Sequence, residues 1–208
     1  MVDLSAESPV SDEDIRPHLR LRDVDFPDGV DLTDANLSNS HLINVDLTGA
    51  NLSGSGLSQA DLTSSTFTRA NLSQANLSHA DLTDTTFDRA NLSHATLSHV
   101  KFTNATFADA NLSSVNFSYA ELNGADFTNV DFTNAESREV LFDGADFTGA
   151  NLTGAELDLP YLHRSAEVPT VSDTTVPDGS TGDSFEDLFQ EGTYSDFDEE
   201  QRGRENGS

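Results

Sequence analysis

The feature that most constrains this chain is a period of five residues. From Leu32 to Leu157 every fifth position is Leu or Phe, with the single exception of Ser137. Two residues earlier runs a register of small or β-branched side chains, so the unit reads A(D/N)LxX, as in Ala50 to Gly54. An α-helix would scatter such leucines around its axis, and an odd period would send them to opposite faces of a continuous strand. The chain must therefore turn once per repeat, with the first and third positions inward.

A longer period shows how many repeats make one coil. Residues that stack between coils of a solenoid should share a spacing, and here they share one of twenty. Spacings of ten or fifteen fail because they would require Phe where the chain has Leu. The sequence therefore predicts a four-sided coil with asparagine ladders hydrogen-bonded between coils. The phenylalanine column is Phe67, Phe87, Phe107, Phe127 and Phe147, and the asparagine column is Asn51, Asn71, Asn91, Asn111 and Asn151, interrupted by Asp131.

These repeats closely resemble those of pentapeptide-repeat proteins, over about Val30 to Leu159. The resemblance implies an all-β fold, a right-handed quadrilateral β-helix with four repeats in each of about seven coils. We expect three parts: an N-terminal arm and cap at 1–20, the β-helix at 21–159, and an acidic, mostly disordered tail at 160–208. Within the tail, Glu167 to Gly182 is rich in Pro, Thr, Ser, Asp and Gly and is typical of a flexible linker.

Two irregularities interrupt the period. Upstream, Leu21 and Phe26 fit the repeat after a shift of one residue, which a turn at Pro27 to Gly29 would absorb. At Ser137 two interpretations compete: a large neighbour fills the missing volume, or the coil is kinked there for a functional reason. We favour the filled core.

Composition excludes several classes of function. The chain has 37 acidic and 10 basic residues and a net charge of -27, which repels nucleic acid and anionic membranes. It has no cysteine, so it forms neither disulfides nor thiolate metal sites. No apolar run is long enough to span a bilayer, and the first residues do not resemble a secretory signal. We therefore expect a cytoplasmic protein that binds neither nucleic acid nor membrane directly.

Chemistry is not expected from a convex rod filled by its own side chains. We find no nucleophile or phosphate-loop motif, and we predict no enzyme activity, cofactor or metal. His79 and His99 fall in one corner column, followed by Tyr119. A zinc ion shared by the two imidazoles is one interpretation, and exposed corner residues without a ligand are the one we favour.

The function predicted from these features is that of a non-enzymatic rigid scaffold or protein-interaction module. The alternative follows from the resemblance, because pentapeptide-repeat proteins that confer quinolone resistance bind type II topoisomerases such as DNA gyrase as acidic mimics of duplex DNA. Such mimics dimerise through their C-terminal ends, so the same resemblance implies a homodimer here. The candidate partner-binding carboxylates crowd the C-terminal coils: Asp126, Asp131, Glu136, Glu139, Asp143 and Asp146.

The acidity has a second explanation that involves no partner. Acidic residues occur in every part of the chain, and this composition resembles that of proteins from halophilic archaea, in which carboxylates maintain hydration in concentrated salt. The tail adds a further candidate, a short helix near 184–191 that presents Phe185, Leu188 and Phe189. It could fold into the groove of a partner, or it could dock on the last coil of this chain or of a second copy.

Overall fold

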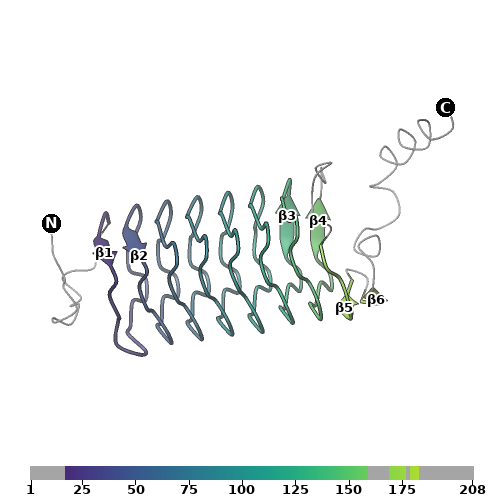
Figure 1. The fold of residues 1–208 in the computed structure, drawn as a ribbon, viewed down its shortest axis with the longest axis horizontal. Helices are drawn as coiled ribbons and strands as arrows, with labels where there is room; N and C mark the ends of the chain where they lie inside the picture. Colours follow the sequence, from purple (N-terminus) through teal and green to yellow (C-terminus); the bar gives the residue numbers. More distant parts are fainter. Residues whose placement is uncertain (1–16, 159–168, 177–178, 183–208) are drawn as a thin grey trace.

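The chain winds into a rod of stacked coils (Figure 1). A computed structural model describes residues 17–158, 169–176 and 179–182. Parallel bridges join residues twenty positions apart along the rod, for example Asn51 to Asn71 and Asn71 to Asn91. These bridges confirm the four-sided, twenty-residue coil, and none of the described residues is helical.

Extended strands are few and short, because each side of a coil spans one repeat. The strands are β1 (Arg20–Arg22), β2 (His41–Ile43), β3 (Glu136–Arg138), β4 (Glu156–Asp158), β5 (Thr174–Thr175) and β6 (Thr181–Gly182). β1 pairs with β2 and β3 with β4, both in parallel, whereas β5 and β6 form an antiparallel pair. Elsewhere each side of a described coil contributes a single bridge.

Corners are made by the fifth residue of each repeat, which adopts a left-handed backbone conformation. Tyr119 has a φ of 62° and His79 of 61°, values that side chains with a Cβ adopt at some cost. Gly149 occupies such a corner with a φ of 69°, which glycine adopts readily, whereas a Cβ there would displace the side-chain oxygen of Asn129 in the preceding coil. The corners thus admit many residue types, whereas the inward positions do not.

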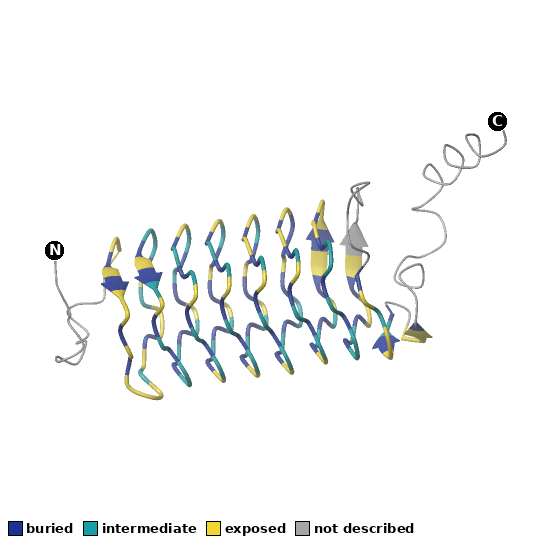
Figure 2. Cartoon of the chain, in the orientation of Figure 1, coloured by how far each residue is buried: buried dark blue, intermediate teal, exposed yellow. Residues whose placement is uncertain are grey.

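The buried apolar side chains form one continuous core along the rod. Buried residues recur around every coil that the structure describes (Figure 2). Leu52 and Ala50 are fully buried, which confirms that the first and third positions of the repeat point inward. Rings in the phenylalanine column stack at 5.0 Å between Phe67 and Phe87 and at 4.9 Å between Phe87 and Phe107. This spacing follows from the distance of about 4.8 Å between paired strands.

The predicted shift at the N-terminal end is confirmed. Leu21 pairs with Leu42, twenty-one residues away, whereas Asp31 pairs with Asn51, twenty residues away. The extra residue is absorbed in a turn where the Val30 amide donates to the Pro27 carbonyl.

The coil is not kinked at Ser137. Its backbone pairs with Leu157 in register, so the kinked alternative is removed. Ser137 is buried, and its hydroxyl has no hydrogen-bond partner among the residues that the structure describes. Phe132 stands in the same coil and Phe117 in the coil before, both in columns that hold Leu in the middle coils, and their rings lie 5.8 Å apart. We attribute the filled volume around Ser137 to these larger side chains.

The expectation of a flexible linker from Glu167 to Gly182 is wrong for the residues that the structure describes. Thr170 pairs with Asp146 and Thr175 with Asn151, so this segment adds two further sides to the solenoid. The physical reason is that Val171 and Val176 keep the five-residue spacing, four residues out of the main register, and Val176 is buried in the core. The predicted helix near 184–191 lies outside the described residues.

Candidate partner-binding surface

The four walls of the rod differ in chemistry, and we name each by its outward residues. The bridges and hydrogen bonds define the columns. The asparagine face carries Asp31, Asn51, Asn71, Asn91, Asn111, Asp131 and Asn151; the serine face carries Ser38, Ser58, Ser78, Ser98 and Ser118. The charged face carries His41, Asp61, Asp81, Lys101, Glu121 and Leu141; the threonine face carries Asp46, Thr66, Thr86, Thr106, Asp126 and Asp146.

The six predicted carboxylates encircle the C-terminal coils and do not form a single stripe. Asp126 and Asp146 stack on the threonine face, where they are bridge partners, and Asp131 lies on the asparagine face. Glu136 follows on the serine face, and Glu139 occupies the corner between the serine and charged faces. The sixth, Asp143, lies beyond that corner on the charged face.

Three of these aspartates fix the backbone turns. The carboxylate of Asp131 accepts from the backbone amide of Thr133 at 3.0 Å and from its hydroxyl at 2.5 Å. Asp126 and Asp146 make the same pair of bonds to the threonines two residues later. In the middle coils Asn111 does this with the amide of Ser113. Asp and Asn are therefore equivalent in this turn, and an Asp–x–Thr spacing in the sequence predicts a structural carboxylate.

Two of the predicted glutamates have no such role. Glu136 and Glu139 are exposed, and within the described part of the chain neither carboxylate makes a hydrogen bond or an ion pair. Glu121, which sequence reasoning did not single out, is exposed and unpaired within the same ranges. The closeness of Glu121 to Glu136 and Glu139 could have been inferred from the sequence. Residue 121 begins the charged face just after the corner at Tyr119, and the period of twenty places Glu139 at the same corner one coil later.

Tyr119 lies at the centre of these glutamates. Its backbone amide donates to the Arg138 carbonyl at 2.7 Å, so Glu139 is its neighbour in the next coil. The Tyr119 side chain is 44% exposed, which is high for a large apolar ring. Two exposed cations adjoin the group: Arg138 lies beside Tyr119, and Lys101 precedes Glu121 on the charged face. We call the group formed by Tyr119, Glu121, Glu136 and Glu139 the corner cluster.

The ring of Tyr119 ends a column of stacked rings along the corner. His79 and His99 are parallel at 4.6 Å, and His99 and Tyr119 at 4.8 Å. Imidazole lone pairs lie in the ring plane, so two parallel stacked rings do not converge on one ion. Within the described residues no group of three potential ligands could hold a metal ion.

Carboxylates are absent from two walls in the middle of the rod. Between Asn51 and Tyr119 the asparagine and serine faces carry Asn, Ser, Gly, Thr, Gln, His and Tyr but no Asp or Glu. The asparagine ladder predicted from sequence is present: the Asn71 amide donates to Asn51 at 3.1 Å and the Asn91 amide to Asn71 at 3.3 Å. At the N-terminal end of this ladder the Thr33 hydroxyl and amide, and then Asn51, hold the pKa of Asp31 below its usual value.

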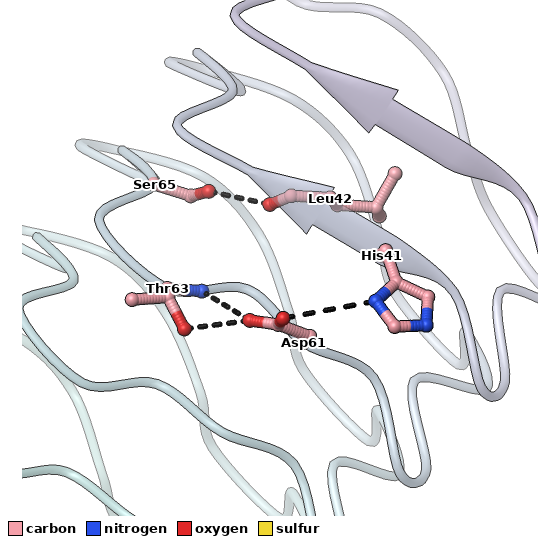
Figure 3. A network of polar contacts seen from close by, with 5 residues as sticks. All are labelled: His41, Leu42, Asp61, Thr63 and Ser65. Atoms are coloured by element: carbon pink, nitrogen blue, oxygen red, sulfur yellow. Dashed lines mark hydrogen bonds and ion pairs between the residues drawn. The ribbon is translucent and has the colours of Figure 1, made fainter.

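The charged face carries a small polar network near its N-terminal end (Figure 3). His41 Nδ1 lies 3.7 Å from one oxygen of Asp61, whose other oxygen accepts from the amide and hydroxyl of Thr63. Behind them the Ser65 hydroxyl donates to the Leu42 carbonyl at 2.7 Å. Both His41 and Asp61 are partly exposed, so this pair is screened by solvent and carries little stabilisation.

The family of the chain follows from its repeats. A family model described as the pentapeptide repeat region matches residues 19–97 and 77–158. The chain belongs to the pentapeptide-repeat family. No helix in the part of the chain that the structure describes is long and apolar enough to cross a membrane. Phe185, Leu188 and Phe189 lie outside the described residues, so the structure does not place them.

Solved pentapeptide-repeat structures are similar to this chain at low identity. Trypsin-treated QnrB1, a plasmid-mediated fluoroquinolone resistance protein, is 23% identical over 67% of this chain and 72% of its own, with a TM-score of 0.44. Rfr23 from the cyanobacterium Cyanothece 51142 is 20% identical over 61% of this chain and 90% of its own, with a TM-score of 0.49. A thylakoid-lumen protein from Arabidopsis thaliana is 30% identical over 49% and 68%, with a TM-score of 0.36. No curated protein matches the chain in sequence.

Proposed function

We propose that this pentapeptide-repeat protein is a non-enzymatic, rigid interaction module that binds a cationic protein partner through the corner cluster. The observation that carries the proposal is the exposed ring of Tyr119 among three unpaired glutamates. Aromatic rings and carboxylates together suit arginine side chains, which stack on a ring face and form bidentate bonds with carboxylates. Because the cluster rests on a continuously hydrogen-bonded wall, a partner would meet groups that are already in place.

The chemistry of the walls also supports a role in binding. Protein interfaces are depleted of charged residues at their centre, and the serine face leading to Tyr119 carries no Asp, Glu, Lys or Arg. The glutamates of the corner cluster supply negative charge that attracts a cationic partner.

Mimicry of DNA against a type II topoisomerase is the second candidate, and the acidity of the C-terminal coils favours it. A mimic of duplex DNA would present carboxylates along the rod in the place of phosphates. Here two walls of the middle coils carry none, and three of the C-terminal aspartates are held in turns. Mimicry is therefore confined, in this proposal, to the C-terminal coils.

Two variants with the same charge change separate these candidates. The first replaces Glu121, Glu136 and Glu139 by Gln; the second replaces Asp126, Asp131 and Asp146 by Asn, which keeps the turn acceptors. Binding of an arginine-rich peptide, measured by calorimetry at low salt, should weaken at least tenfold in the first variant and little in the second. Equal loss in both variants would contradict a localised site.

The same proteins test the second candidate directly. Supercoiling by a purified type II topoisomerase is titrated with the unaltered chain and with both variants. Mimicry predicts inhibition that both variants reduce, because each removes three charges from the C-terminal coils. No inhibition at tens of micromolar would remove mimicry for that enzyme, and it would leave binding at the corner cluster to be judged by the peptide titration.

A further inference from the structure

Among the residues that the structure describes, a segment at the C-terminal end of the solenoid covers two of its four walls. On the threonine face the Phe147 amide donates to the Thr170 carbonyl at 2.9 Å, and on the asparagine face the Leu152 amide donates to the Thr175 carbonyl at 2.7 Å. In return the Thr175 amide donates to the Ala150 carbonyl at 2.8 Å. The segment Pro169–Val176 thus occupies the place of a further coil on these walls; we call it, together with β6, the end cap.

Strand β6 closes the outer edge of this cap. It pairs with β5 in antiparallel fashion, Thr175 opposite Thr181, while the other edge of β5 faces Asn151. The asparagine face therefore ends in a reversed strand of two residues, whereas all its other bridges are parallel. An exposed edge invites the addition of another strand, and a very short edge strand invites it less.

On the asparagine face, the first coil has the same order of inward and outward residues as the end cap, so it could pair with the backbone groups that the cap now covers. Thr174–Thr175–Val176 places a β-branched residue inward, a polar residue outward and an apolar residue inward, and Val30–Asp31–Leu32 has the same order. The Asp31 amide has no hydrogen-bond partner in the described ranges, whereas the next amide in its column, that of Asn51, donates to the Val30 carbonyl. The Asp31 amide of a second copy could therefore donate to Ala150 as Thr175 does now.

We propose that the end cap closes a latent head-to-tail interface, whose occupant in the absence of the cap is the first coil of a second copy of this chain. Such a contact joins unlike ends, so it does not close and would build open-ended filaments. Carboxylates at both ends, Asp25 and Asp31 at one and Asp146 and Glu156 at the other, oppose it at low salt. At about 1 M salt the Debye length falls to about 3 Å, and the cap becomes the main barrier.

Variants of the full-length chain test this inference. Val176→Asp places a charge in the end of the core, and Thr175→Pro removes the amide that donates to Ala150. Ser172→Asp is the matched control, because it adds the same charge at an exposed position of the cap. Hydrogen exchange at the Phe147 and Leu152 amides shows whether the cap has detached while the rest of the solenoid stays protected.

The readout is mass by sedimentation velocity in high salt over a tenfold range of concentration. We expect both cap variants to form a concentration-dependent, polydisperse series, with the control matching the unaltered chain. Adding Asp31→Pro to either variant should restore the original mass, because it removes the donor of the incoming coil. Detached caps with unchanged mass would overturn the proposal, and so would a single closed dimer, which would join like ends.

Discussion

The middle coils and the C-terminal coils share one backbone and differ in what they place inside and outside it. Between Asn51 and Tyr119 the core is mainly Leu, with one phenylalanine column and with Phe102 and Phe117 outside it, and two walls carry no carboxylate. Beyond Tyr119 the core gains Phe132 and Phe142, loses one side chain at Ser137, and carboxylates appear on all four walls. The bridges continue in register through both regions. The coil therefore constrains the size of the inward side chains and the Asp or Asn that accepts hydrogen bonds in the turns, but it leaves the other outward residues free to vary.

The largest effect should come from removing a phenylalanine in the middle of the rod. Phe107 is fully buried between Phe87 and Phe127, whereas Phe147 lies in the last full coil and is 6% exposed. Phe107→Ala should lower the free energy of unfolding by about 3–5 kcal/mol, since it leaves a cavity that stacked coils cannot fill. Phe147→Ala should cost less, because the end cap can move inward. Urea unfolding of both variants measures the difference, and equal costs would show that the two regions are packed alike.

The core around Ser137 provides a second test. If Phe117 and Phe132 fill its missing volume, then Ser137→Leu overpacks the core and should destabilise the chain by about 1–3 kcal/mol. In a background that carries Phe132→Leu, the same substitution should cost much less, or stabilise. A double-mutant cycle from unfolding curves gives the coupling between the two sites. Additive effects would mean that Phe132 does not compensate for Ser137.

The turn acceptors should separate charge from structure in the two regions. Asn111→Ala and Asp131→Ala each leave a turn amide without its side-chain acceptor and should cost about 1 kcal/mol. Asp131→Asn should change stability by much less than either, because the amide oxygen replaces the carboxylate oxygen. Thermal unfolding of the three variants at neutral pH measures this. A large loss in Asp131→Asn would show that the negative charge itself matters in the turn.

The sequence was sufficient to predict the four-sided coil but not the role of each outward residue. The five-residue period leaves the chain one way to bury both inward registers, and the twenty-residue period gives the number of sides in each coil. The one-residue slip at Pro27 could be predicted from the same pattern. The end cap was missed because its register is displaced by four residues and its core positions are Val171 and Val176, which look unlike Leu and Phe repeats. The candidate carboxylates were chosen by density along the chain, which does not distinguish Asp131, held in a turn, from Glu136, exposed and unpaired.

The smallest effect is a pH dependence that the N-terminal end should show more than the middle coils. Hydrogen bonds from Thr33 and Asn51 lower the pKa of Asp31 in the folded chain, so its ionised form is favoured by folding. That contribution is present above the pKa of the unfolded chain and is lost as the pH falls through the lower, folded value. Asp31→Asn should therefore flatten slightly the loss of stability below about pH 4, and it should lower stability near neutral pH slightly, because the contribution of the ionised carboxylate is lost there. Unfolding curves between pH 2 and pH 7 test this, with Asn71→Ala, in the uncharged part of the same ladder, as the control that should leave the slope unaltered. If the slope with pH is the same in Asp31→Asn and in the unaltered chain, the bonds from Thr33 do not favour the charged carboxylate.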